Sequence, residues 1–286
     1  MKQIVVISGK GGTGKTMLTG AFAALAENKV MADCDVDAAN LHLLLHPTVK
    51  ESHSFRSGFV AEINPAACTR CGQCVAACRF KAISEEFVAD PVACEGCWLC
   101  ARVCPVNAIT MKENTAGSWF VSETRYGPFV HAKLGIAEEN SGKLVAKVRQ
   151  TAKELAEEKR ADYVIIDGPP GIGCPVIASL SGVDLAVVVT EPTLSGHHDA
   201  ERVMDAARHF DIPVKLVVNK YDLNPVMTEK IEAFCRARDV SVIGRIAFDK
   251  MVVQALVAGK TIVEYADCQA GNEARKIWEY LKNQEE

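Results

Sequence analysis

A glycine-rich segment near the start of the chain limits the possible folds most strongly. Residues Gly9–Thr16 read Gly-Lys-Gly-Gly-Thr-Gly-Lys-Thr and fit the pattern G-x-x-x-x-G-K-[ST]. The apolar run Ile4–Ile7 precedes this segment, and Lys15–Asn28 follows with apolar residues at helical spacing. In a strand–loop–helix of this kind, backbone N–H groups of the loop and the positive end of the helix dipole face phosphate oxygens. We predict phosphate binding by Gly9, Lys10, Gly11, Gly12, Thr13, Gly14, Lys15 and Thr16, with Lys15 on the outer phosphates and Thr16 on Mg²⁺.

Residues 117–135 alternate and contain Gly and Pro, so they indicate a hairpin or a bent strand, and from Lys143 the alternation of strands and helices returns. Short apolar runs indicate buried strands, and longer stretches with apolar residues three and four apart indicate helices. Such alternation predicts an α/β fold with a doubly wound, mostly parallel sheet. The expected later strands are Tyr163–Ile166, Leu185–Thr190, Lys215–Val218 and Val242–Ile246, and the expected later helices span about 143–156, 197–209, 226–238 and 270–283.

Composition excludes several classes of protein. The net charge of −4 gives no basic surplus for binding nucleic acid, and 49% hydrophobic with 24% charged residues is ordinary for a globular chain. No apolar run approaches the ~18 residues that a membrane span needs, and the first residues lack a secretory signal. We expect a cytoplasmic protein with no nucleic-acid partner and no membrane anchor.

Cysteines mark a second site. Eight of the 12 cysteines lie between Cys68 and Cys104, and in a reducing cytoplasm such a group indicates metal binding rather than disulfides. Zinc is the alternative metal, because C-x2-C pairs also bind Zn²⁺. The two C-x2-C-x2-C-x3-C runs resemble the bacterial ferredoxin run, in which three cysteines hold one [4Fe–4S] cluster and the fourth holds the other. We therefore expect one cluster on Cys68, Cys71, Cys74 and Cys104, and a second on Cys94, Cys97, Cys100 and Cys78.

These features divide the chain into three segments. Residues 1–60 and 115–286 are expected to form one nucleotide-binding domain, and residues 61–114 are expected to form an inserted, bacterial-ferredoxin-like 2[4Fe–4S] domain. An insertion this short builds little apolar core, so clusters would supply its cross-links. A purely structural role for the clusters therefore remains open.

The nucleotide motifs resemble those of the MinD/ParA/Mrp/nitrogenase iron-protein family of P-loop ATPases. A second lysine in the loop, Lys10, is typical of that family, where it reaches across a dimer to the partner's phosphates. The resemblance implies that Asp35 positions the attacking water, that Asp167 holds Mg²⁺ and that Asn219 contacts the base. It also implies ATP hydrolysis, with Lys10, Lys15 and Asp35 as the catalytic residues, in a homodimer or a heterodimer with a paralogue.

Several assignments stay open on the sequence alone. Asn219–Asp222 also fits the NKxD guanine-binding motif of GTPases, so GTP is an alternative to ATP. Asp37 is a less certain helper of Asp35, and Asp249 resembles a base-proximal residue. Cys174 lies at the spacing of a cluster ligand in the nitrogenase iron protein, although packing is the simpler interpretation. The remaining cysteines, Cys34, Cys235 and Cys268, are expected to pack in the interior.

Together the motifs favour a protein that couples Mg-ATP binding and hydrolysis to electron transfer through two [4Fe–4S] clusters to a redox partner protein. One alternative is an ATPase that carries or assembles iron–sulfur or other metal cofactors. Another is an ATP-dependent positioning module whose clusters only brace the fold.

Overall fold

The structure, a computed structural model, describes residues 1–135 and 141–283. Its strands are β1 (Lys2–Ser8), β2 (Lys29–Asp33), β3 (Thr48–Ile63), β4 (Ile109–Thr124), β5 (Gly127–Leu134), β6 (Tyr163–Pro170), β7 (Leu185–Thr190), β8 (Val214–Asn219) and β9 (Ser241–Ile246). Its helices are α1 (Lys15–Leu25), α2 (His42–Leu45), α3 (Gln73–Ala77), α4 (Leu99–Val103), α5 (Ser141–Lys159), α6 (Cys174–Leu180), α7 (Leu194–His209), the 3₁₀ turn η1 (Tyr221–Leu223), α8 (Pro225–Ala237), α9 (Lys250–Val257), α10 (Ile262–Tyr265) and α11 (Gln269–Lys282).

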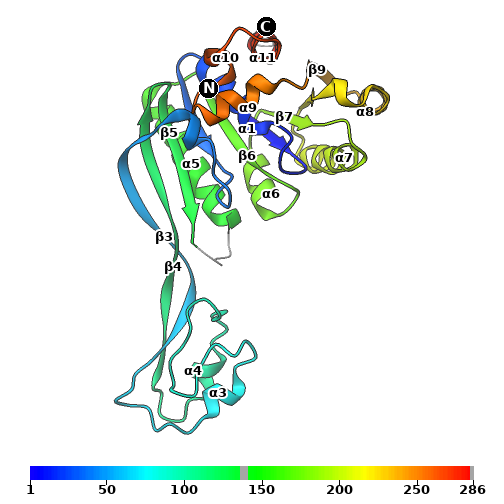
Figure 1. The fold of residues 1–286 in the computed structure, drawn as a ribbon. Helices are drawn as coiled ribbons and strands as arrows, with labels where there is room; N and C mark the ends of the chain where they lie inside the picture. Colours follow the sequence, from blue (N-terminus) through cyan, green and yellow to red (C-terminus); the bar gives the residue numbers. More distant parts are fainter. Residues whose placement is uncertain (136–140, 284–286) are drawn as a thin grey trace. The chain divides into compact units, whose positions relative to one another are not determined.

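In the described part of the chain, the strands form a nine-stranded sheet in the order β3-β4-β5-β2-β6-β1-β7-β8-β9 (Figure 1). From β5 to β9, each neighbouring pair of strands is parallel. The prediction of an α/β fold with a mostly parallel sheet is confirmed. The central strands β1, β6 and β7 are buried almost throughout, as expected for strands covered on both faces.

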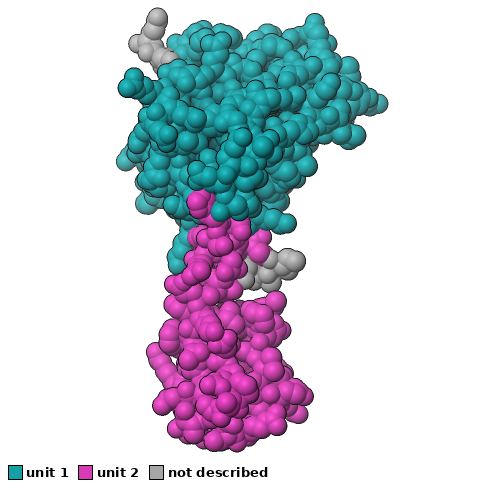
Figure 2. Space-filling view, turned by 90° about the vertical axis from the view of Figure 1, so that its left-hand side faces the viewer, with its two compact units in different colours: residues 1–52, 119–133, 141–286 teal, residues 53–118, 134–140 magenta. Residues whose placement is uncertain are grey.

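Two compact units share the chain (Figure 2). Unit 1 consists of Met1–Ser52, Trp119–Lys133 and the chain from Ser141 onward, and unit 2 consists of His53–Ser118 and a short segment that begins at Leu134. The predicted domain boundaries near residues 60 and 114 fall inside β3 and β4. Strand β3 was not expected, whereas the hairpin expected over residues 117–135 corresponds to the end of β4 and to β5. The ferredoxin-like nature of the insertion stays a prediction.

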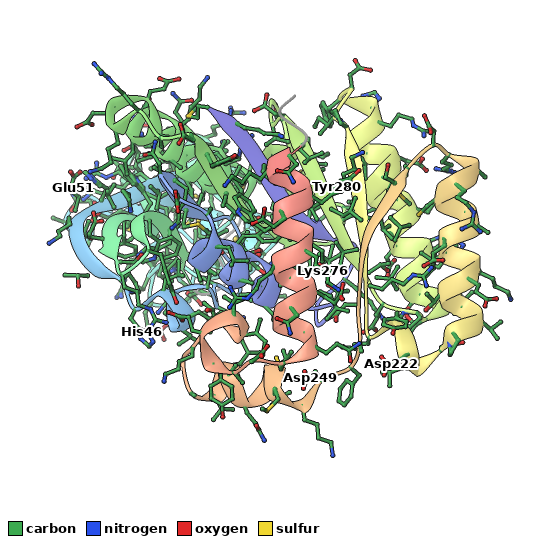
Figure 3. All side chains as sticks on the ribbon, turned by 90° about the horizontal axis from the view of Figure 1, so that it is seen from above. His46, Glu51, Asp222, Asp249, Lys276 and Tyr280 are labelled. Atoms are coloured by element: carbon green, nitrogen blue, oxygen red, sulfur yellow. The ribbon has the colours of Figure 1, made fainter. Side chains whose placement is uncertain are left out.

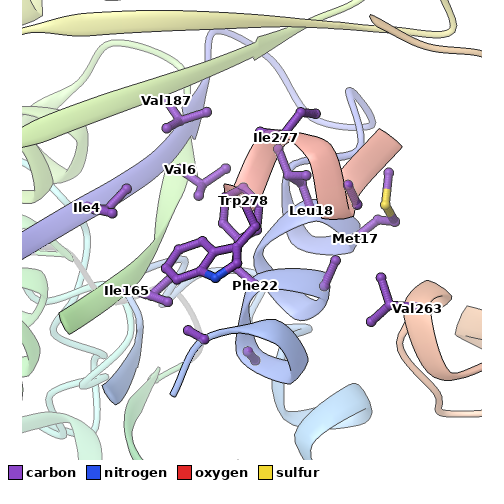
Figure 4. Packing of buried hydrophobic residues seen from close by; sticks show 14 of the residues in the cluster. Ile4, Val6, Met17, Leu18, Phe22, Ile165, Val187, Val263, Ile277 and Trp278 are labelled. Atoms are coloured by element: carbon purple, nitrogen blue, oxygen red, sulfur yellow. The ribbon is translucent and has the colours of Figure 1, made fainter. Parts of the chain in front are cut away.

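Alternating side chains of the buried strands build the main core of unit 1. Ile4 and Val6 of β1 belong to the same apolar cluster as residues of α1 and α11, while Val5 and Ile7 point to the opposite face. In the view from above, α11 carries Lys276 and Tyr280 across the sheet (Figure 3). Trp278 of the same helix packs against Phe22, with 5.3 Å between their ring centres (Figure 4). Its ring centre also lies 5.3 Å from that of Tyr163.

Unit 2 has a much smaller apolar core. Its buried members are Ala61, Cys74, Ile83, Cys100 and Ile109, so two of them are cysteines. Two short helices, α3 and α4, pack against each other around this core. No helix in residues 1–135 or 141–283 is long and apolar enough to cross a bilayer.

Candidate functional site: a phosphate-binding loop and two cysteine-lined cavities

The loop between β1 and α1 presents an uncapped helix N-terminus. Gly14, in the left-handed region with φ 95°, precedes α1 and has no side chain to cap this helix. Thr13 is almost fully buried, and its Oγ1 has no hydrogen-bond partner in the described structure. A buried hydroxyl without a partner is costly, and free helix N–H groups attract anions. Both features fit a phosphate group at this loop.

Gly14 is required by a close contact as well as by its backbone angle. A Cβ atom at this position would lie 2.1 Å from Nδ2 of Asn219. The same Nδ2 donates a hydrogen bond of 2.8 Å to the carbonyl oxygen of Thr13. Asn219 ends β8, so this contact fixes the phosphate-binding loop against the carboxyl end of that strand.

Buried opposite charges meet behind the loop. The Lys15 ammonium lies 3.1 Å from Oδ1 of Asp167 and 3.4 Å from Oδ2 of Asp35. The hydroxyls of Thr16 and Thr19 each donate a 2.9 Å hydrogen bond to the Asp167 carboxylate. The structure therefore brings together four of the predicted residues: Lys15, Thr16, Asp35 and Asp167.

Burial and neighbouring charges shift the pKa values of Lys15, Asp35 and Asp33. Burial alone would lower the pKa of Lys15, but the charges of Asp167 and Asp35 outweigh it, and the pKa is raised. Burial raises the pKa of Asp35, although Lys15 opposes the shift. Burial and the nearby charge of Asp167 also raise the pKa of Asp33 well above its ordinary value. The single lysine thus sits among more carboxylates than it can neutralise, which favours a bound cation.

Asp33 shapes the segment that carries Asp35. Its two carboxylate oxygens accept hydrogen bonds from the backbone N–H groups of Asp35 at 3.0 Å and Leu41 at 3.3 Å. Asp37, the predicted helper, is exposed, whereas Asp35 is nearly buried beside Lys15. The arrangement therefore favours Asp35 over Asp37 as the carboxylate that faces the reacting group.

The second loop lysine, Lys10, is held within its own chain. Its ammonium forms an ion pair of 2.7 Å with Glu191 and hydrogen bonds of 3.2 and 3.0 Å with the hydroxyls of Thr193 and Ser195. Glu191 also pairs with Lys220 at 2.9 Å, and the Lys220 ammonium donates a 3.0 Å hydrogen bond to the carbonyl oxygen of Gly12. Glu191 therefore links a cation of the phosphate-binding loop, Lys10, to one that contacts the loop from outside, Lys220.

Two carboxylates lie beyond the carboxyl ends of β8 and β9, where the base of the nucleotide is predicted to bind (Figure 3). Asp222 accepts a 2.7 Å hydrogen bond from the backbone N–H of Phe248, which joins the two loops. Asp249 caps α9 through a 2.9 Å hydrogen bond from the backbone N–H of Met251. Both carboxylates thus have structural partners, and their contact with a base stays a prediction.

The clustered cysteines of unit 2 line two separate cavities. All eight are free thiols. One cavity is lined by Cys68, Cys71, Cys74 and Cys104. The other is lined by Cys78, Cys94, Cys97 and Cys100. Each cavity thus contains the four cysteines expected for one cluster, which fits a soft, thiolate-held group at each place.

The metal itself stays a prediction. Within residues 1–135 and 141–283, no group of three or more His, Cys, Asp or Glu side chains is arranged closely enough to hold a single metal ion. A cubane cluster differs from a single ion, because it carries one cysteine on each of four iron atoms. The support for clusters therefore comes from the four cysteines that line each cavity.

The other cysteines differ from expectation in two places. Cys174 begins α6 and is exposed, so its interpretation as a packing residue is wrong. Cys268 is only partly buried, and its sulfur caps α11 by accepting a hydrogen bond of 3.5 Å from the N–H of Gly271. Cys34 and Cys235 are buried, as predicted.

Three functional contacts were missed from the sequence. Thr19 follows Lys15 by one helical turn, and a hydroxyl at that spacing is a signal that could have been read. Glu191 follows strand β7 directly, which is where ligand-binding side chains of a parallel sheet gather. Lys220 was noted only as part of a motif, and its contact with Gly12 depends on the folded arrangement.

A family model agrees with this geometry. The model of the CobQ/CobB/MinD/ParA nucleotide-binding domain matches residues 4–262. The chain belongs to the CobQ/CobB/MinD/ParA nucleotide-binding family. This match confirms the MinD/ParA part of the predicted resemblance; the two-cluster insertion is a separate question.

Individual members of the family show different degrees of similarity. The uncharacterised protein MJ0578 of Methanocaldococcus jannaschii is 33% identical over 284 residues, covering 98% of this chain and 96% of the relative. An iron–sulfur cluster carrier protein of Pyrococcus abyssi is 27% identical over 153 residues, 48% of this chain and 52% of the relative. Among solved structures, the septum site-determining protein MinD of Pyrococcus horikoshii, complexed with Mg-ADP, has a TM-score of 0.61 at 17% identity, covering 99% and 96% of the two chains.

Proposed function

We propose that this protein binds and hydrolyses Mg-ATP and couples its nucleotide state to electron transfer through two [4Fe–4S] clusters. The observation that carries the proposal is the presence, in one chain, of a phosphate-binding loop and two cavities that each contain four free cysteines. The solved relative with Mg-ADP supports Mg²⁺ and an adenine nucleotide. Iron–sulfur clusters supply one-electron chemistry, and the chain supplies their position.

Lys15 and Asp167 divide the work of binding the nucleotide. The Lys15 ammonium contacts Asp167 and Asp35, so phosphate oxygens compete with these carboxylates for it. Asp167 and Thr16 would hold Mg²⁺, through oxygen ligands of the kind that this ion prefers. The charge of the metal would offset the buried Asp167 carboxylate, which matters where burial strengthens charge interactions.

Asp35 and Lys10 act on the reacting phosphate. Asp35 positions the attacking water, and burial holds its carboxylate in a defined place beside Lys15. Lys10 reaches the phosphates of a second subunit once it leaves Glu191. Asp35→Ala tests the first role: it should bind Mg-ATP with near-normal affinity, and its hydrolysis rate should fall by about 10²-fold or more. Hydrolysis at the normal rate would refute the assignment of Asp35.

An anaerobic redox titration followed by EPR tests the coupling. The reconstituted protein is titrated with and without Mg-ATP, and Lys15→Ala, which should not bind nucleotide, serves as the control. A tenfold change in the ratio of reduced to oxidised cluster, about 59 mV for one electron, is expected with Mg-ATP for the natural protein alone. Potentials that do not respond to Mg-ATP would refute coupling at the clusters.

A second candidate function is ATP-dependent delivery of iron–sulfur clusters. It is supported by the similarity of about half the chain to an iron–sulfur cluster carrier protein. The two functions predict different fates for iron. A carrier loses iron to an apo-acceptor protein when Mg-ATP is present, whereas an electron-transfer protein keeps its iron through repeated reduction and oxidation.

A further inference from the structure

Unit 2 contains an internal repeat that makes its two cavities comparable residue by residue. Helices α3 and α4 are each five residues long, and each follows a residue with positive φ, Gly72 at 77° and Trp98 at 67°. Positive φ also recurs two residues earlier, at Arg70 with 57° and Gly96 with 60°. The segment from Cys68 to Cys78 therefore has the same local backbone as the segment from Cys94 to Cys104.

The repeat extends to hydrogen bonds on sulfur. The backbone N–H of Ala82 donates to Sγ of Cys78 at 3.3 Å, and the N–H of Ala108 donates to Sγ of Cys104 at 3.2 Å. The two halves thus offer equivalent surroundings to their last cysteines. Differences between the cavities must come from side chains at equivalent positions and from further N–H donors.

Two pairs of equivalent side chains differ in charge and polarity. Thr69 lines the first cavity, and Glu95 occupies the matching place in the second. Gln73 lines the first cavity, and Leu99 occupies the matching place in the second. The first cavity also gains a hydrogen bond of 3.4 Å from the N–H of Arg70 to Sγ of Cys68.

All of these differences act in the same direction. Adding one electron makes a thiolate-held cluster more negative, so hydrogen-bond donors favour the reduced form and a nearby carboxylate opposes it. The first cavity, with Cys68, Cys71, Cys74 and Cys104, has the hydroxyl, the amide and the additional N–H donor. The second, with Cys78, Cys94, Cys97 and Cys100, has the carboxylate and the aliphatic side chain.

We infer that the two cluster sites have unequal reduction potentials, with the site at Cys68, Cys71, Cys74 and Cys104 the higher. This inference rests on the proposed function, because it requires both sites to hold [4Fe–4S] clusters. An electron that enters at the second site passes to the first: the second loses one electron, the first gains one, and no bond forms or breaks. Thr69 and Glu95 are the pair of equivalent residues that differ in charge, so they are the pair to exchange.

A swap of the equivalent residues tests the inference. Iron content is measured first, because a protein that takes up no iron–sulfur clusters would refute the proposed function itself. Reductive titration with dithionite, followed by EPR, should then resolve two one-electron steps in the natural protein. In Glu95→Thr, the lower step should move toward the upper one by less than a tenfold change in the reduced-to-oxidised ratio, about 59 mV, because Glu95 is exposed and water screens its charge.

The reverse change and two controls complete the experiment. Thr69→Glu should lower the upper step, and the double swap should move both steps toward each other. Glu95→Gln removes the charge with little change in shape and should behave like Glu95→Thr. Glu113→Gln removes a carboxylate of unit 2 that lines neither cavity and pairs with Arg56, so both steps should stay in place. Full iron content with a single two-electron step would overturn the inference. Midpoint potentials that stay the same after the changes at residues 69 and 95 would also overturn it.

Discussion

Lys15 is the residue on which the buried charges of the nucleotide site depend. It is 5% exposed and contacts Asp167, which is 0% exposed, and Asp35. Lys15→Met should lower the free energy of unfolding by about 3–5 kcal/mol, because it leaves buried carboxylates without their cation. Urea denaturation without added nucleotide measures the loss. Lys220→Met is the control: its ion pair with Glu191 is partly exposed and should contribute about 1 kcal/mol or less, and an equal loss in both variants would contradict the prediction.

Glu191 gives the site a dependence on pH. Burial would raise its pKa, but hydrogen bonds from Lys10 and Lys220 outweigh burial and lower the pKa below the ordinary value of 4.5. A lowered pKa means that Glu191 stabilises the fold above its ordinary pKa and that this contribution is lost as the pH falls through the lowered value. Glu191→Gln should therefore be less stable than the natural protein at pH 7 by about 1 kcal/mol.

Unfolding curves of both proteins between pH 7 and pH 3 measure this contribution. The difference between them should disappear toward the acid end of the range. A difference that persists below pH 3, or that grows as the pH falls, would show that Glu191 acts through packing and not through its charge.

Residues of the phosphate-binding loop could be predicted because the motif is local in the sequence. The conformation of Gly9–Thr16 depends on its own short sequence. The acidic residues could be predicted because ligand-binding side chains gather at the carboxyl ends of parallel strands. The contacts of Lys10 with Glu191 and of Lys220 with Gly12 could not be predicted, because they join residues far apart in the chain. Cys174 shows the opposite error: its small, weakly polar side chain suggested burial, yet it lies exposed at the start of α6.

At the scale of elements, the loop before α1 is fixed by its contact with α7. A Cβ atom on Gly9 would lie 2.4 Å from Cβ of Asp199 and 2.5 Å from its backbone, whereas one on Gly11 would meet nothing within 4 Å. Gly9→Ala should displace the loop, lower the free energy of unfolding by about 1–3 kcal/mol and weaken nucleotide binding at least tenfold. Gly11→Ala is the matched control, and titration with a fluorescent ATP analogue compares the two. Equal affinities would mean that the loop does not need its contact with α7.

Elements whose apolar pattern is continuous were predicted within a residue or two. β7 is an example, because both of its faces are buried and every residue of Leu185–Thr190 is apolar or small. β3 was missed, because most of its side chains are exposed and its sequence alternates only weakly. A strand of this kind forms because it pairs with its neighbour β4 in the sheet. The hydrophobic pattern of its own sequence does not reveal that pairing.

At the scale of the whole molecule, the two units differ in what stabilises them. Unit 1 has an extensive apolar core, whereas the core of unit 2 includes Cys74 and Cys100 among its few buried members. If clusters supply the missing cross-links, removing iron with a chelator should unfold His53–Ser118 and leave nucleotide binding intact. Limited proteolysis read by mass spectrometry locates the cleavage sites. A chelated protein whose cysteine-rich unit still resists protease would show that its small core is sufficient.

The exchange of one cysteine between the halves of unit 2 has a consequence for its ancestry and assembly. Each cavity takes three thiols from one half of the repeat and the fourth, Cys104 or Cys78, from the other. Neither half could therefore line a complete cavity by itself, and a free-standing half would have to pair with a second copy. Joining the halves in one chain makes this pairing intramolecular and supplies the fourth thiol at an effective concentration on the order of millimolar. The covalent connection therefore replaces the dimer interface that two separate halves would need.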